Sequence, residues 1–293
     1  MRKIAVIFSL IYLTLYVLLS TIGQRGEFAA EKMLWKINHK ATRVLQDTNN
    51  IPKPQSDKII KDYQKFLSRY ADTKIGPSGY FQMVKLYWVL KDFEKSRLVS
   101  QELIKKYTSR PEIAAQGHAQ IALSYTQEGN VPKAIETYNI ILADLPHTLT
   151  GLNTPIFIAQ TYIHANDTAA ADKAFDEAIN YYMQMVSKHP QSVIAMQSIK
   201  LSAHIYTIKK QWGSAVKEYG DILIQFGKKI NPAIANEIVK AINTITLTQT
   251  KDYIQAIEIY AAFIKQYPQH PFNTTFRKLI SELEQLKNTM DAS

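Results

Sequence analysis

Apolar side chains recur at helical spacing along most of the chain. Between residues 27 and 45 they fall at every third or fourth position, which predicts an amphipathic helix. The segment 47–54 interrupts this pattern, because Pro52 and Pro54 oppose helix both in themselves and in the residue before each. Beyond it the spacing resumes and continues to a last one-sided stripe that contains Phe276, Leu279 and Leu283. The pattern predicts an all-α protein.

One arrangement of small and aromatic residues occurs three times. Each copy has a small residue, an aromatic three residues later, a second small residue at offset 12 and a second aromatic at offset 16. A small residue lets two antiparallel helices approach closely, and the aromatic one turn away fills the space beside the next hairpin. Because each hairpin alone leaves an apolar face uncovered, we expect neighbours to stack. The copies are Ala122, Tyr125, Ala134 and Tyr138; Ala159, Tyr162, Ala171 and Phe175; and Ala203, Tyr206, Ala215 and Tyr219.

This arrangement resembles the tetratricopeptide repeat (TPR) family, whose consensus ends each hairpin with a proline. Residues 119–146 form the closest copy, with Gly129 at the turn and Pro146 at the end. Equivalent positions lie 38, 37, 44 and 41 residues apart, against about 34 in the family. The largest excess follows Ala171, where we expect a longer second helix and hence an irregular array. Weaker copies flank the three: Val84, Tyr87, Phe93 and Ser96, and then Tyr253, Ala256, Tyr260 and Pro268, which supply only a second helix.

The predicted fold is an antiparallel helix-hairpin solenoid preceded by one N-terminal transmembrane helix. We expect a signal anchor over residues 1–23 and a juxtamembrane amphipathic helix with a proline-containing linker over 24–56. The TPR-like repeats follow over 57–268, and a capping helix and tail over 269–293. A one-sided terminal helix is what a helical array needs to close its apolar end.

The predicted anchor is the uncharged, mostly apolar run of residues 4–23. Twenty helical residues reach roughly 30 Å, one hydrocarbon thickness. A cleaved secretion signal is one alternative, although its apolar region is typically about 7–15 residues long, and an unrelated buried helix is the other. Basic residues flank the run on both sides, so charge does not fix the orientation. Because long domains translocate largely regardless of charge, we expect the domain outside the cytoplasm, and in the periplasm if the protein is bacterial.

The residue types needed for common catalytic and metal sites are absent or scattered. The chain has no cysteine, which excludes thiol catalysis, thiolate metal ligands and attachment of lipid through an N-terminal cysteine. The seven histidines form no pair at i, i+4, and no phosphate-binding or dinucleotide-binding glycine motif occurs. We therefore predict no catalytic residue, no metal site and no cofactor. Lys and Arg exceed Asp and Glu by 35 to 25, but the charges are interspersed, so nucleic acid is not expected as a partner.

The resemblance to TPR proteins implies a scaffold that binds protein or peptide partners through its concave face. The layout is similar to that of single-span ancillary subunits of the secretion translocon, so a role in envelope protein assembly or secretion is expected. In TPR arrays the ligand-facing positions follow the small residue and the aromatic of each first helix. Transferred to this chain, they predict a groove lined by Lys85, Trp88, Leu123, Thr126, Gln160, Ile163, His204 and Thr207, with His164 and Lys200 on the same face.

Three other interpretations of these residues stay open. The groove residues can be ordinary solvated positions of the helices. The basic balance can serve binding of nucleic acid or another anionic polymer, which steep salt dependence would reveal. A cell-envelope hydrolase with an atypical site would require a pocket that holds a titratable pair with shifted pKa values.

Overall fold

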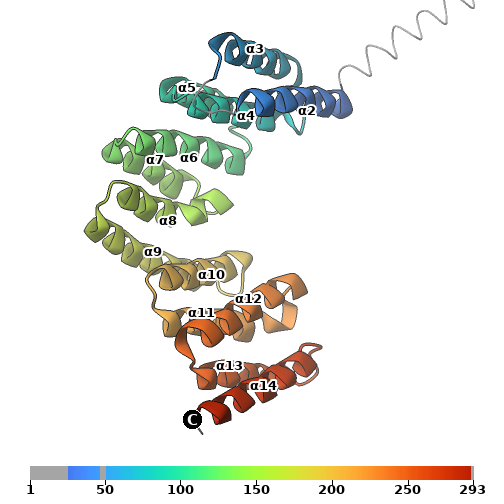
Figure 1. Ribbon diagram of the computed structural model, residues 1–293, viewed down its shortest axis with the longest axis vertical. Coiled ribbons are helices and arrows are strands. Elements are labelled where there is room, and N and C mark those ends of the chain that lie inside the picture. Colours follow the sequence, from blue (N-terminus) through green and yellow to red (C-terminus); the bar gives the residue numbers. More distant parts are fainter. Residues whose placement is uncertain (1–25, 47–50, 292–293) are drawn as a thin grey trace, which may run out of the picture. The chain divides into compact units, whose positions relative to one another are not determined.

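The computed structural model describes residues 26–46 and 51–291, and within these ranges all regular structure is helical (Figure 1). The described residues form two compact units, a first unit up to residue 150 and a second unit from residue 151. The predicted transmembrane helix lies outside the described residues. Among the described helices, none is both long enough and apolar enough to cross a bilayer.

The first unit consists of α2 (Glu27–Val44), α3 (Lys53–Tyr70), α4 (Gly76–Val89), α5 (Phe93–Lys106), α6 (Pro111–Gln127) and α7 (Val131–Asp144). The second contains α8 (Leu149–His164), which begins just before the boundary, α9 (Thr168–Lys188), α10 (Val193–Ile208) and α11 (Trp212–Phe226). A short 3₁₀ turn, η1 (Gly227–Lys229), leads to α12 (Pro232–Ile245), and a π-helical segment, η2 (Thr246–Thr250), leads to α13 (Tyr253–Gln266) and α14 (Asn273–Asp291).

The turns within four successive hairpins share one backbone geometry. Each contains a residue in the left-handed region: Lys91, Gly129, Asn166 and Lys210, with φ of 57°, 74°, 59° and 56°. The N–H of the following residue donates to the carbonyl of the first-helix aromatic, as from Asn130 to Tyr125 at 2.9 Å. This bond closes the helix in a Schellman motif. The recurrence confirms that the hairpins around α4–α5, α6–α7, α8–α9 and α10–α11 are repeats.

The predicted packing positions are buried in the hairpins. In the first helices Ala122, Ala159 and Ala203 are each 0% exposed, and in the second helices Ala134, Ala171 and Ala215 are at most 3% exposed. The first-helix aromatics Tyr125, Tyr162 and Tyr206 are only partly buried. The expected long second helix is also confirmed, since α9 has 21 residues where α5 and α7 have 14. The small residues therefore mark the close helix contacts.

Helix α2 is part of the first unit, which differs from the expected separate juxtamembrane helix and linker over 24–56. Ala30, Leu34 and Ile37 are buried in the cluster that α2 shares with α3, α4 and α5. The Tyr63 hydroxyl of α3 donates to Asn38 Oδ1 of α2 at 2.8 Å. The expected linker is also shorter, because α3 begins at Lys53. Its Pro54 is tolerated there, since the first turn of a helix needs no backbone N–H donor.

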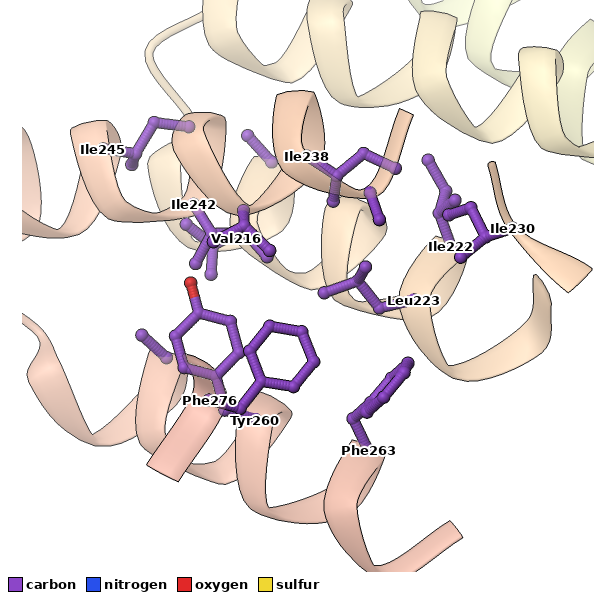
Figure 2. Packing of buried hydrophobic residues seen from close by; sticks show 14 of the residues in the cluster. Val216, Ile222, Leu223, Ile230, Ile238, Ile242, Ile245, Tyr260, Phe263 and Phe276 are labelled. Atoms are coloured by element: carbon purple, nitrogen blue, oxygen red, sulfur yellow. The ribbon is translucent and has the colours of Figure 1, made fainter. Parts of the chain in front are cut away.

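The second unit contains a first helix that the repeat pattern missed. Helix α12 supplies Ile238 and Ile242 to the core of this unit, where Phe263 of α13 and Phe276 of α14 also lie (Figure 2). It continues into the π-helical segment η2, whose i→i+5 bonds change the residue spacing before the next turn. The fixed offsets of the other repeats therefore do not apply to the hairpin of α12 and α13. Helix α14 packs on α13 through Phe276 and Leu283, as expected for a terminal helix.

Candidate peptide-binding surfaces

The predicted groove residues of the first unit are mostly used for packing. Lys85 is exposed, whereas the Trp88 ring is partly buried and meets the Phe93 ring edge-on at 5.7 Å between centroids. Leu123 is partly buried as well. Thr126 is only 4% exposed, and its hydroxyl donates to the carbonyl of Ala122 at 3.2 Å. Thr126 is thus not an accessible ligand-facing residue.

In the second unit the predicted positions are more accessible. Gln160, His164 and His204 are exposed, and Ile163 is 47% exposed. Gln160 and His204 directly follow the buried Ala159 and Ala203 along α8 and α10. Ala159 and Ile205 belong to one apolar cluster that joins α8, α9 and α10. This cluster therefore connects α8 and α10, the helices that carry Gln160 and His204.

Lys200 and Thr207 have partners within the unit. Lys200 Nζ lies 2.7 Å from Glu237 Oε1, so an ion pair links α10 to α12. The Thr207 hydroxyl donates to the carbonyl of Ala203 at 3.0 Å, and Thr207 is partly buried. Glu237 was missed in the sequence because α12 lacks the repeat pattern. We define the α8–α10 face by Gln160, Ile163, His164, Lys200 and His204, with Glu237 at its edge.

A pocket of about 270 Å³ lies between α9, α10 and α11 in the second unit. It is lined by Tyr182, Val186, Ser198, Ser202, Glu218 and Asp221, among others. Burial raises the pKa of Glu218, and the charge of Asp221 adds to this effect. Asp221 itself is paired with Lys217 at 2.9 Å. The two carboxyl groups therefore make the pocket unfavourable for an anion.

A similar pocket of about 440 Å³ occurs in the first unit between α3, α4 and α5. The first pocket lies over the first helix α10 and between the second helices α9 and α11, and this pocket lies in the same way over α4 and between α3 and α5. Its lining includes Tyr80, Met83, Tyr87 and Glu102. Sequence reasoning missed both pockets, because their carboxylates look like ordinary exposed helix positions. Within residues 26–46 and 51–291, no group of three or more His, Asp or Glu side chains is arranged to hold a metal ion.

No family model matches the chain, and no curated protein matches it. Similar solved structures include BtubC from P. vanneervenii, at 11% identity over 89% of this chain and 93% of that chain, with a TM-score of 0.39. A thermophilic TPR protein from Thermus thermophilus is 14% identical over 71% of this chain and 99% of that chain, with a TM-score of 0.37. The TPR2AB domain of yeast Sti1 in complex with pHSP90 is 13% identical over 88% of this chain and 100% of that chain, with a TM-score of 0.34.

The fold is TPR-like. This conclusion comes from the repeated turns, the buried small residues at consensus positions and the stacked hairpins within each unit.

Proposed function

We propose that the protein is a membrane-tethered scaffold that binds extended segments of partner proteins on the α8–α10 face. The observation that carries this proposal is the set of exposed polar side chains, Gln160, His164 and His204, on two first helices that contribute to one apolar cluster. This set of side chains offers hydrogen-bond donors and acceptors to a partner. A partner segment that lies across it in an extended conformation presents its own backbone groups for pairing.

The charges of the α8–α10 face make binding there selective for certain partners. The pair of Lys200 and Glu237 is partly solvent-exposed, with side-chain exposures of 31% and 57%. A partner can therefore meet either sign of charge there, in addition to the apolar side chain of Ile163. This mixture fits a peptide with carbonyl or acidic groups better than a purely apolar helix, because an apolar partner would cover the polar side chains without pairing them.

The binding face is tested by replacing Gln160, His164 and His204 together with alanine. All three are exposed, so the fold should be unchanged, and recovery of partners after crosslinking in membranes should fall about tenfold or more, which corresponds to about 1.4 kcal/mol of binding free energy. The matched control replaces Asn180, Gln184 and Lys188, which are exposed on the second helix α9. If the first variant captures the same partners in the same amounts as wild type, the α8–α10 face is not the binding site.

The tether is supported by the uncharged run of residues 4–23, which lies just before α2. The full chain should sediment with membranes and resist carbonate extraction, whereas a chain without residues 1–23 should be soluble. Release of the intact full chain by carbonate would reject the tether. Protease protection in vesicles tests the proposed placement of the domain outside the cytoplasm; digestion from the cytoplasmic face alone would reverse it.

A further inference from the structure

Helix α2 carries two different faces. One is buried in the first unit through Ala30, Leu34, Ile37 and Ala41. The opposite face exposes two large aromatic side chains, Phe28 at 75% and Trp35 at 65%. At about 100° per residue, basic residues share this second face with them. We call it the outer stripe of α2, and it consists of Phe28, Lys32, Trp35, Lys36, His39 and Arg43.

The direction of the outer stripe is set by the packing of α2. The Glu27 carboxylate accepts a hydrogen bond from the backbone N–H of Lys74 at 2.8 Å, which ties the start of α2 to the α3–α4 connection. Lys40 Nζ lies 2.7 Å from Asp62 of α3, which holds the other half. The Trp35 and His39 rings are stacked, with 5.4 Å between centroids and 4° between planes. The outer stripe is thus a preformed aromatic and basic surface.

The composition of the outer stripe favours a lipid surface over a protein partner. Lysine is depleted in the buried centre of protein interfaces, yet here Lys32 and Lys36 flank Trp35. Helices that bind at the membrane interface contain both aromatic residues and lysine or arginine, and in α2 both kinds lie on the exposed stripe because the apolar face is buried in the first unit. The positive charges of Lys32, Lys36 and Arg43 complement anionic lipid headgroups.

The position of α2 in the chain places the outer stripe within reach of the bilayer. Phe28 lies five residues after Gly23, the end of the uncharged run. Five residues span at most about 18 Å. If residues 4–23 cross the membrane, Phe28 therefore lies close to the headgroup layer.

We propose that the outer stripe of α2 lies in the interfacial layer of a membrane that contains anionic lipids, so that the first unit rests against the bilayer. This inference rests on the proposed tether and adds to it the contacting residues and the class of lipid. The rings of Phe28 and Trp35 enter the boundary between headgroups and acyl chains, and the basic side chains remain at the level of the phosphates.

The test uses the full chain in vesicles of phosphatidylcholine, with or without phosphatidylglycerol, whose acyl chains are brominated to quench tryptophan. The signal of Trp35 is the difference between wild type and W35F, because Trp88 and Trp212 remain in both. We expect this difference to be blue-shifted and strongly quenched in the anionic vesicles. K32E/K36E should reduce the quenching several-fold. The control K228E/K229E makes the same charge change at exposed lysines of the second unit and should leave it unchanged.

Absence of quenching of Trp35 in a chain that still resists carbonate would overturn the inference and leave the tether standing. Release by carbonate would instead reject the tether itself. A photoreactive residue at position 35 gives an independent measurement in native membranes: lipid adducts support the inference, and adducts to a protein or to a second copy of the chain overturn it.

Discussion

Replacement of Phe263 with alanine is expected to lower the free energy of unfolding by about 3 to 5 kcal/mol. Phe263 is 1% exposed, and its ring meets those of Tyr267 and Phe276 edge-on at 5.0 and 4.8 Å between centroids. Truncation removes this burial and leaves a cavity where α13, α14 and the end of α11 meet, because Gly227 also packs against the ring. Figure 2 shows the ring facing Leu223 across this core.

Chemical denaturation of F263A and wild type measures this difference. The matched control is I254A on the same helix, because Ile254 is 50% exposed and should change the stability by about 0.5 kcal/mol or less. A loss below about 1 kcal/mol in F263A would show that the core around α13 and α14 is not packed as described.

Replacement of Ala171 with leucine is expected to destabilise the second unit by about 1 to 3 kcal/mol. Ala171 is 3% exposed near the start of α9, at the same repeat position as Ala134 and Ala215, which are both 0% exposed. A leucine there must push neighbouring side chains off their preferred rotamers or move the helices apart. Because repeats couple mainly to their neighbours, amide exchange should increase most in α8, α9 and α10 and least in α14.

The matched control for this substitution is A169L. Ala169 lies two residues earlier on α9 and is exposed, so an added leucine meets solvent. The thermal midpoint should fall by several degrees in A171L and remain nearly constant in A169L. Equal midpoints for the two variants would mean that the helix register is wrong.

The role of the small residues could be predicted from the sequence because it is local and periodic. A helix contact that repeats in every hairpin requires a small side chain at the same offset each time, so Ala122, Ala159 and Ala203 stand out by spacing alone. The turn between the first and second helix of one hairpin could also be predicted from its glycine, and Gly129 does adopt a φ of 74°. At Lys91 and Lys210 the same conformation occurs without a glycine, so composition did not reveal those turns.

Accessibility and ion pairing were decided only by the tertiary structure. Thr126 and Gln160 both follow a first-helix packing residue in the sequence, yet Thr126 is buried and Gln160 is exposed. Lys200 was expected on the face of the groove, but Glu237 pairs with it from a helix that the repeat pattern did not reveal.

The sequence by itself determined that the chain is helical, that its hairpins repeat and which small residues lie at the close contacts. Helical periodicity and turn chemistry act over a few residues, so they are readable without the fold. The tertiary structure decided that α2 packs into the first unit and turns its aromatic and basic stripe outward. An amphipathic helix can be placed by pattern alone, but only the packing of the folded chain decides that α3 and α4 cover its apolar face.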